Sequence, residues 1–312
     1  MEMITVNEKQ QLVEATPLTL VIGNFDGVHK GHQVILQKAR EQMKDGEILA
    51  VMGFADHPLW VLKNDQDFDK KITPEQDKLH LLERLGVDRY YHLKITKDDI
   101  KTTFWEFVFE QLSNLKVNRI VMGEGADYDE ASHTEFLNLC DWQGIEVTVV
   151  PKVKVNGTKI SSRTIRDYIK EGLMDPVHAL LGRPFTVTGT VVHGEKMGRK
   201  LGFPTLNLGE VDSYVVPKPG VYLGIVGIHE DGVISEYWNT LISAGYRPAV
   251  NGHRYLIEAH LLNFSGDLYD KTVSVSFLRF MREELNFDNL DDLVEQMEKD
   301  KIEGEKLMGQ NW

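Results

Sequence analysis

The sequence lacks several features that define whole classes of protein. It contains one cysteine, Cys140, which excludes an intramolecular disulfide framework and a zinc site built from several cysteines. No stretch approaches 18 consecutive apolar residues, so no membrane-spanning helix is expected. The first ten residues have neither the basic region nor the apolar core of a secretory signal. We therefore expect a cytoplasmic protein with no membrane partner, in which Cys140 is a packed thiol on a helix.

An excess of positive charge is also missing. The 312 residues carry a formal net charge of −13, and acidic clusters such as residues 288–300 are spread along the chain. Proteins that bind the nucleic-acid backbone need a basic stripe, so no nucleic-acid partner is expected. A small anionic ligand can still bind locally, through backbone N–H groups and a few cations. The length and the 42% hydrophobic content are typical of a globular protein with two domains.

The first half of the chain alternates strand-like and helix-like stretches. Strands are predicted at residues 18–23, 47–54, 88–95, 118–123 and 145–151, and helices at 33–43, 73–86, 102–115 and 134–144. In the second helix Thr73 resembles a cap and Pro74 suits the first helical position. Such alternation predicts an α/β domain with a parallel sheet and helices on both of its faces.

The pattern changes near residue 183. Strands with little helix between them are predicted at residues 184–194, 220–228, 236–243, 254–262 and 271–280, followed by a helix at 288–307. In the first of these strands Phe185, Val187 and Val191 share one side. Short strands separated by turn residues predict a small antiparallel β-barrel. We place the domains at residues 1–182 and 183–312.

The stretch "GNFDGVHKGHQ", residues 23–33, links the first predicted strand to the first predicted helix. A helix N-terminus presents unpaired N–H groups and a partial positive charge that attract phosphate. His29 and His32 can donate hydrogen bonds to phosphate oxygens and stabilise charge that develops during transfer. The competing interpretation is a plain turn with two exposed histidines. The phosphate loop G-x-x-x-x-G-K-[ST] occurs nowhere in the chain.

This stretch resembles the nucleotide signature of the adenylyltransferase half of prokaryotic bifunctional riboflavin kinase/FAD synthetases. That half belongs to the HxGH nucleotidyltransferase superfamily, which has a Rossmann-like fold. "ISSRTIR", residues 160–166, is similar to the family's "ISSTxIR", and His57–Pro58 after "VMGF" resembles its "TFxPHP". The resemblance implies that His29 and His32 act in adenylyl transfer. It also implies contacts to ATP and its phosphates from Gly23, Asn24, Phe25, Gly27, Gly31, Ser161, Ser162 and Arg166.

Three positions depart from the pattern of that family. Arg163 stands where the family usually has threonine, and Asp56 replaces a proline. The family's "GxDFxFGxxxxG" has become "GEGADYDEASHTEF" at residues 123–136. Four acidic residues of this stretch take the place of the aromatic–glycine pattern, namely Glu124, Asp127, Asp129 and Glu130.

The stretch "VVHGEKMGRKLGFPTLNL", residues 191–208, resembles the riboflavin kinase signature "GxVxHGxxxGRxLGFPTAN". Glycines there suit a loop that folds closely over phosphates. The residues implied for ATP binding are Gly194, Lys196, Gly198 and Arg199. Thr205 and Asn207 offer neutral oxygen ligands two residues apart on one face, which suits Mg²⁺ bound together with ATP.

Transfer of a phosphoryl group to a hydroxyl needs a base near the attacking oxygen. Glu258 matches the family's catalytic glutamate, and a carboxylate among apolar neighbours is costly unless it is paired or functional. "FLRFMREELNF" is similar to the family's "FlRxExkF", which implies that Arg282 and Glu283 contact the flavin.

The resemblance covers most of both domains and implies two reactions. Riboflavin and ATP give FMN in the C-terminal domain, and FMN and ATP give FAD in the N-terminal domain, with Mg²⁺. Other possibilities are a kinase with a degenerate adenylyltransferase half, the converse, or a flavin- or nucleotide-binding regulator without turnover. A relative of tRNA synthetases is disfavoured by the charge of −13. The sequence leaves the oligomeric state open.

Overall fold

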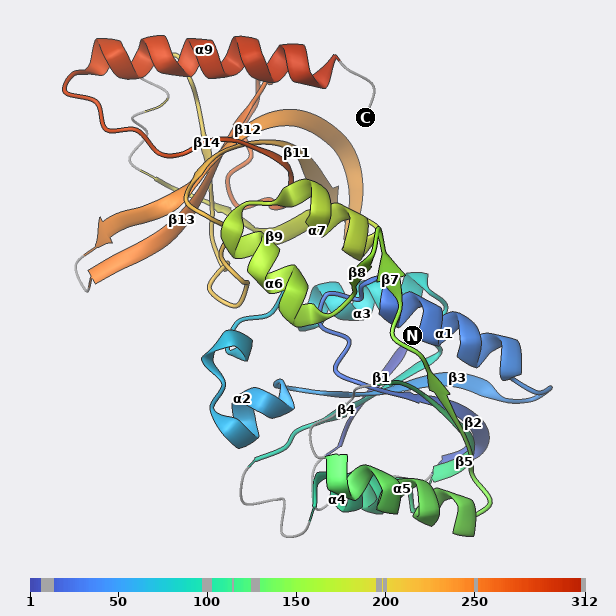
Figure 1. The fold of residues 1–312 in the computed structure, drawn as a ribbon. Helices are drawn as coiled ribbons and strands as arrows, with labels where there is room; N and C mark the ends of the chain where they lie inside the picture. Colours follow the sequence, from blue (N-terminus) through green and yellow to red (C-terminus); the bar gives the residue numbers. More distant parts are fainter. Residues whose placement is uncertain are drawn as a thin grey trace. The chain divides into compact units, whose positions relative to one another are not determined.

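The computed structural model describes residues 1–6, 14–96, 103–113, 115–124, 130–194, 198, 201–249 and 252–309 (Figure 1). By their contacts the residues divide into two compact units, Met1–Thr164 and Ile165–Trp312. The predicted domain boundary lies further along the chain, between residues 182 and 183. Helix α6 (Ser162–Glu171) crosses the first of these positions, and α7 (Met174–Leu181) lies between the two. The boundary at 182 stays a prediction.

The first unit is built on a six-stranded sheet in the order β1-β4-β3-β2-β5-β6. All of its neighbouring strands are parallel, as the sequence predicts. Its strands are β1 (Glu2–Val6), β2 (Glu14–Ile22), β3 (Ile48–Phe54), β4 (Arg89–Leu93), β5 (Leu115–Gly123) and β6 (Glu146–Val150). Strand β1 was not predicted, because two of its five residues are polar and no turn signal marks its ends.

Helices cover both faces of this sheet (Figure 1), as predicted. α1 (Lys30–Gln42) and α3 (Glu75–Arg84) pack on one face, and α4 (Phe104–Leu112) and α5 (Glu130–Trp142) on the other. Alternate side chains of β2 point to opposite faces of the sheet. Because helices cover both faces, the strand is buried on both. Leu20 joins the core under α4 and α5, and Val21 joins the core under α1 and α3. Cys140 is fully buried on α5, and burial raises its pKa to about 12.

The connections of the first unit contain short elements that the sequence analysis does not predict. They are α2 (Pro58–Lys63), the 3₁₀ turn η1 (Gln66–Phe68) and the hairpin of β7 (Lys154–Val155) with β8 (Thr158–Lys159). The start predicted for α3 was also wrong. Pro74 is the N-cap and makes no side-chain cap, while the amide of the buried Thr73 donates to the carboxylate of Asp26. The carbonyl of Pro74 accepts the amide of Lys78 at 2.9 Å, so the helical hydrogen bonds begin at Pro74.

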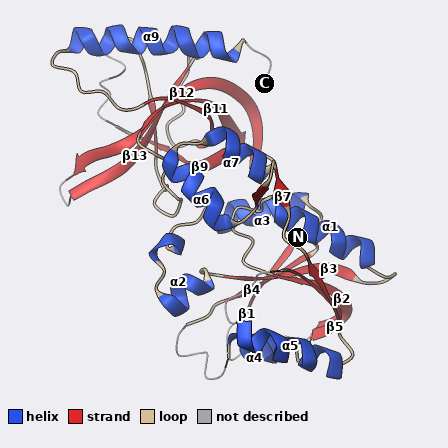
Figure 2. Cartoon of the chain, in the orientation of Figure 1, coloured by secondary structure: helices blue, strands red, loops and turns tan. Residues whose placement is uncertain are grey.

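The second unit contains the predicted barrel, a closed antiparallel one in the order β10-β13-β12-β11-β14-β9 (Figure 2). Its strands are β9 (Phe185–Val192), β10 (Leu206–Leu208), β11 (Gly220–Glu230), β12 (Val233–Ala249), β13 (Gly252–Leu261) and β14 (Thr272–Arg282). Phe185, Val187 and Val191 of β9 are all buried, as their alternation predicts. Strand β10 was not predicted because three residues are too few to show a period.

The C-terminal helix α9 (Leu290–Met308) packs against the barrel. The side chain of Asn289 accepts a hydrogen bond from the Asp292 amide and caps its first turn. Gly304 lies so close to β12 that a Cβ there would be 2.8 Å from Leu241. Helix α7 contacts β9 and β14. Among the described residues, no helix is long and apolar enough to cross a bilayer.

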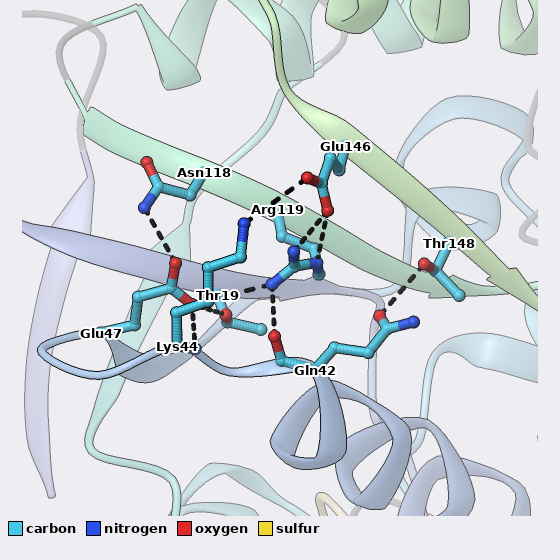
Figure 3. A network of polar contacts seen from close by, with 8 residues as sticks. All are labelled: Thr19, Gln42, Lys44, Glu47, Asn118, Arg119, Glu146 and Thr148. Atoms are coloured by element: carbon cyan, nitrogen blue, oxygen red, sulfur yellow. Dashed lines mark hydrogen bonds and ion pairs between the residues drawn. The ribbon is translucent and has the colours of Figure 1, made fainter.

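A polar network holds the chain between α1 and β3 against the sheet (Figure 3). The carboxylate of Glu47 is almost fully buried and accepts hydrogen bonds from Thr19 Oγ1 at 2.6 Å and Asn118 Nδ2 at 2.8 Å. Arg119 lies 3.8 Å from the same carboxylate and also pairs with Glu146 on β6. Burial opposes ionisation of Glu47, but these hydrogen bonds and Arg119 outweigh it and lower its pKa.

We predict that Glu47→Gln lowers the free energy of unfolding of the first unit by about 1–3 kcal/mol at pH 7, because one acceptor oxygen becomes a donor NH₂ group and the charge that faces Arg119 is lost. Since folding lowers the pKa of Glu47, its stabilisation is present above the unfolded value of 4.5 and is lost as pH falls through the folded value. The difference between the two proteins should therefore shrink towards pH 3. Hydrogen exchange of the β2 and β3 amides measures it, with Glu41→Gln of an exposed ion pair as control. Equal stabilities at pH 7 would contradict the prediction.

Candidate active sites

The turn between β2 and α1 has a strained backbone. Phe25 and Val28 both adopt positive φ, at 56° and 39°, although neither is glycine, and Gly27 between them has φ 83°. Non-glycine residues in this region cost free energy and concentrate at functional sites. The turn follows the carboxyl end of β2, which pairs with β3 on one side and β5 on the other. Ligands of open α/β sheets bind at this edge.

His29 and His32 lie together at the start of α1, as their spacing predicts. His29 is the N-cap, and its Nδ1 accepts a hydrogen bond from the His32 amide at 3.2 Å. The two imidazole rings are stacked, with centroids 3.6 Å apart and an interplanar angle of 9°. A Cβ at Gly31 would come within 3.1 Å of the His29 ring. The glycine between the histidines therefore allows the rings to stack beside the helix N-terminus, where an anion is favoured.

Phe25 packs against His32 of this pair. Its side chain is buried, and its ring centroid lies 4.6 Å from that of His32. The amide of Gly23 donates to the carbonyl of Met52 at the end of β3, so the turn starts from a fixed position on the sheet. Gly23 and Asn24 are half-buried at the start of the turn. Their predicted contacts to ATP stay a prediction.

Asp26 holds the candidate site together, and the sequence analysis missed it. Its buried carboxylate accepts hydrogen bonds from the amides of Ile72 at 2.9 Å and Thr73 at 3.1 Å. Its backbone carbonyl accepts a hydrogen bond from Ser162 Oγ at 2.9 Å. One residue thus joins the turn, the segment before α3 and the "ISSRTIR" stretch. The signal was an acidic residue in a loop proposed to bind an anion, where a carboxylate is unfavourable unless it has a structural partner.

The "ISSRTIR" stretch leads into α6, which begins at Ser162. Ser161 Oγ accepts the amide of Thr164 at 3.1 Å and contacts the Thr164 hydroxyl at 2.9 Å, which is an N-cap arrangement. Ser162 reaches the turn through Asp26, so two of the predicted motifs meet. Arg166 is buried one turn further along α6. Its role towards phosphate stays a prediction.

The segment after β3 contains the His57–Pro58 pair. His57 is the N-cap of α2, and its Nδ1 accepts the Leu59 amide at 3.2 Å. Its ring stacks on Phe68, with centroids 3.9 Å apart. Asp56, which replaces the family's proline, pairs with Lys71 at 3.1 Å. These contacts fix His57 just after the carboxyl end of β3. Strand β3 is the neighbour of β2 in the sheet.

The altered stretch at residues 123–136 is described only in part. The carboxylate of Glu124 accepts the amide of Lys152 at 3.1 Å, and Glu130 is the first residue of α5. Asp127 and Asp129 lie outside the described residues.

In the second unit, glycines bring the chain close to the predicted metal ligands. A Cβ at Gly194 would lie 2.3 Å from Asn207 Nδ2, and one at Gly198 would lie 3.3 Å from Thr205 Oγ1 and 2.4 Å from the Phe203 carbonyl. Glycine is needed at both positions for this approach. Lys196 and Arg199, the predicted cations of the loop, lie outside the described residues.

Strand register brings Asn207 to Glu258. Asn207 on β10 is the direct cross-strand neighbour of Glu258 on β13. Directly opposite residues of an antiparallel pair have Cβ atoms about 4.5–5.5 Å apart on one face. Both residues are half-buried, while Leu206, Leu208, Ile257 and Ala259 beside them point into the barrel. The predicted base and a predicted metal ligand therefore share the outer face of the barrel.

A pocket of about 360 Å³ in the second unit is lined by Thr205 but by neither Asn207 nor Glu258. Thr205 lines it, together with Val191, Pro204 and the residues 264–269 that follow β13. Its volume and its mixed polar and apolar lining are suited to a nucleotide-sized ligand. The pocket thus contacts Thr205, one of the two residues that we predict to bind Mg²⁺.

Arg282 and Glu283, the predicted flavin contacts, are both engaged in ion pairs. Arg282 Nε donates to Asp300 of α9 at 2.8 Å, and Asp300 is buried. Glu283 is exposed and pairs with Lys218 Nζ at 2.7 Å, which lowers the pKa of the glutamate. These contacts fix the end of β14 to α9 and to the chain before β11. A flavin contact from either residue stays a prediction.

Comparison with known proteins assigns the two halves of the chain to two families. A family model for FAD synthetase matches residues 12–164, and one for riboflavin kinase matches residues 181–308. The chain is 34% identical over 286 residues to a bifunctional riboflavin kinase/FMN adenylyltransferase of Listeria monocytogenes, with 90% of each protein covered. It is 32% identical over 311 residues to the protein of the same name from Bacillus subtilis, with 97% of each covered.

A solved structure also matches the whole chain. It is described as a macrolide-efflux protein from Streptococcus pneumoniae, with a TM-score of 0.84, 30% sequence identity and 100% of both chains covered. Its fold is therefore shared over both units.

We predict that Gly194→Ala weakens the binding of Mg·ADP about tenfold, because the new methyl group displaces the Asn207 side chain. The displaced atoms end a flexible side chain, so the free energy of unfolding should change by less than about 1 kcal/mol. Calorimetric titration measures the affinity. Gly309→Ala is the control, since its Cβ meets nothing nearer than 3.7 Å. Unchanged affinity in Gly194→Ala would show that Asn207 does not contribute.

Proposed function

The chain belongs to the bifunctional riboflavin kinase/FMN adenylyltransferase family, and we propose that it makes both FMN and FAD. Its second unit transfers the γ-phosphoryl group of ATP to riboflavin and releases ADP. Its first unit transfers the adenylyl group of a second ATP to FMN and releases pyrophosphate. The observation that carries the kinase assignment is the cross-strand pairing of Asn207 with Glu258.

Glu258 is the proposed base of the kinase. The riboflavin hydroxyl loses its proton to the carboxylate of Glu258 as its oxygen attacks the γ-phosphorus, and the bond to the ADP oxygen breaks. Such a base must lie within hydrogen-bond reach of the hydroxyl and close to the metal-bound phosphates. Its position opposite Asn207 supports both requirements, because the two side chains share one face.

Thr205 and Asn207 are the proposed ligands of Mg²⁺. Mg²⁺ takes oxygen ligands and is usually shared between a few protein groups, water and nucleotide phosphates. Gly194 approaches the side chain of Asn207 closely and Gly198 approaches that of Thr205, which supports a loop folded over these two proposed ligands. A bound Mg²⁺ would neutralise charge on the phosphates. We assign Gly194, Lys196, Gly198 and Arg199 to the phosphates, and Arg282 and Glu283 to the flavin.

His29 and His32 are the proposed catalytic residues of adenylyl transfer. Their stacked rings at the N-terminus of α1 support hydrogen bonds to ATP phosphates and stabilisation of charge on the reacting phosphate. A phosphate oxygen of FMN attacks the α-phosphorus of ATP, and pyrophosphate leaves, so no covalent enzyme intermediate is needed. Ser161, Ser162 and Arg166 are assigned to the same phosphates.

We propose that the partners are small molecules: riboflavin, FMN, FAD and ATP. The net charge of −13 supports the absence of a nucleic-acid partner. We also propose that the protein works in the cytoplasm and has no membrane partner, which the lack of a long apolar run supports.

One incubation tests both reactions. The full-length protein is mixed with riboflavin, ATP and Mg²⁺, and riboflavin, FMN and FAD are separated by chromatography while pyrophosphate is followed. We expect FMN first and FAD after it. FMN without FAD or pyrophosphate would reduce the function to riboflavin kinase, and the absence of both products would favour a regulator without turnover.

We predict that Glu258→Gln lowers the rate of FMN formation by about 10²–10⁴, because loss of a general base typically costs this much. FAD formation from added FMN should stay near the wild-type rate, since His29 and His32 belong to the other unit. Chromatography of both half-reactions measures the split. Equal FMN production by the variant and the wild type would overturn the assignment of Glu258.

We predict the opposite split for the double variant His29→Ala/His32→Ala. FAD formation from FMN should be lost, because the phosphates lose both imidazoles, while FMN formation from riboflavin stays nearly unchanged. The assay follows FAD and pyrophosphate with purified FMN and ATP. If the double variant makes as much FAD as the wild type, the two histidines are ordinary turn residues.

A further inference from the structure

Arg163 makes two ion pairs with one short segment of the first unit. Its Nη1 lies 2.8 Å from Asp67 Oδ2, and its Nη2 lies 2.7 Å from Asp65 Oδ2. Its guanidinium carbon lies 4.7 Å from the centroid of the Phe68 ring. Arginine is suited to this geometry, because its planar group pairs with two carboxylates and packs on an aromatic face together. Three contacts of one side chain therefore converge on residues 65–68.

Phe68 carries these contacts to the site. Its ring is buried and stacks on His57, with an interplanar angle of 23°. His57 in turn caps α2 directly after β3. The planar groups of Arg163, Phe68 and His57 thus form a stack that links the start of α6 to the carboxyl end of β3.

Other hydrogen bonds hold the two ends of the segment of residues 55–73. Lys71 Nζ donates to the Ala55 carbonyl at 2.7 Å, and Asp26 accepts the amides of Ile72 and Thr73. These bonds fix the two ends of the segment. Arg163 fixes its middle from outside, through residues 65–68.

The ion pairs of Arg163 are partly exposed. The side chain of Arg163 is 47% exposed, that of Asp67 44% and that of Asp65 29%. Exposed pairs are individually weak and screened by salt, so they adjust a local equilibrium and do not hold the fold. The pKa of Asp65 is lowered, chiefly by its hydrogen bond with Arg163, which keeps the pair ionised near neutral pH.

We propose that Arg163 is a positioning residue for adenylyl transfer. Through Asp65 and Asp67 it holds residues 56–68 in place. The chain around His57 is therefore ordered before the substrates bind. The inference rests on the proposed adenylyltransferase function. Threonine, which the resemblance gives for this position, is uncharged and cannot form either ion pair. A segment that is ordered before binding lowers the free-energy cost of binding and leaves the chemical step unchanged.

The test compares Arg163→Thr with the wild type, using the full chain with FMN, ATP and Mg²⁺. We expect the KM for FMN, for ATP or for both to rise about tenfold, which corresponds to about 1.4 kcal/mol, while kcat changes less than about twofold. Hydrogen exchange of the helical and turn amides of residues 61–68 should accelerate by a similar factor. FMN formation from riboflavin, in the other unit, should stay unchanged. Arg163→Lys, which keeps one ion pair, should restore part of the difference.

The variant Asp65→Asn/Asp67→Asn separates positioning from direct contact. If Arg163 acts through the two aspartates, this variant raises KM as Arg163→Thr does, and combining the two sets of changes adds little. A KM that stays at the wild-type value in the aspartate variant would show that Arg163 contacts a substrate itself, and would overturn the proposal.

Two further results would overturn it. Unchanged KM and unchanged hydrogen exchange in Arg163→Thr would show that the ion pairs do not order the segment. A fall in kcat with faster exchange across the whole sheet would show a general structural role. If the wild type makes no FAD, the proposed function fails instead, and hydrogen exchange still decides whether Arg163 orders residues 61–68.

Discussion

The first unit depends on the hydrogen bonds that Asp26 makes within a strained turn. Two residues of that turn have positive φ without being glycine, and such a backbone persists only where its surroundings determine it. The hydrogen bonds of Asp26 hold this backbone in place. Its carboxylate accepts two amides before α3, and its carbonyl accepts the hydroxyl of Ser162. The stacked histidines, the start of α6 and the segment after β3 all take their positions from this residue. Because backbone amides before α3 bind the carboxylate of Asp26, the amides at the N-terminus of α1 are left for an anion.

The two units build their sites in different ways. In the first unit, loops at one edge of a parallel sheet converge, and hydrogen bonds between loops set the geometry. In the second, the strand register sets it, because Asn207 and Glu258 are fixed opposite each other by the ladder between β10 and β13. A loop site can be adjusted by one substitution such as Arg163. A site on a barrel face is less adjustable, since a shift of β10 by one residue would turn Asn207 inward and away from Glu258.

Much of this arrangement could be predicted from the sequence. Alternating patterns predicted the parallel sheet, the barrel and α9, and the motifs predicted His29, His32 and the Thr205–Asn207 stretch. Patterns failed where elements were too short to show a period, as in β10 and η1, or where a distant group decided the structure. Asp26 is an example, because the Ile72 and Thr73 amides that its carboxylate binds lie 46 and 47 residues further along the chain. The partners of Arg163 could not be predicted either, since Asp65 and Asp67 lie about a hundred residues away in sequence and only the fold brings them close.

Strand β10 is three residues long and is paired with both β9 and β13, so the barrel is closed through it. Asn207 lies on this closing strand, and Glu258 lies on a strand formed much later in the chain. Contacts of large sequence separation form late in folding, because the chain between them must first be ordered. Pairing of β10 with β13 therefore closes the barrel and brings Asn207 opposite Glu258 in the same step. A partly folded second unit in which β10 is still unpaired, such as one emerging from the ribosome, would hold these two side chains apart.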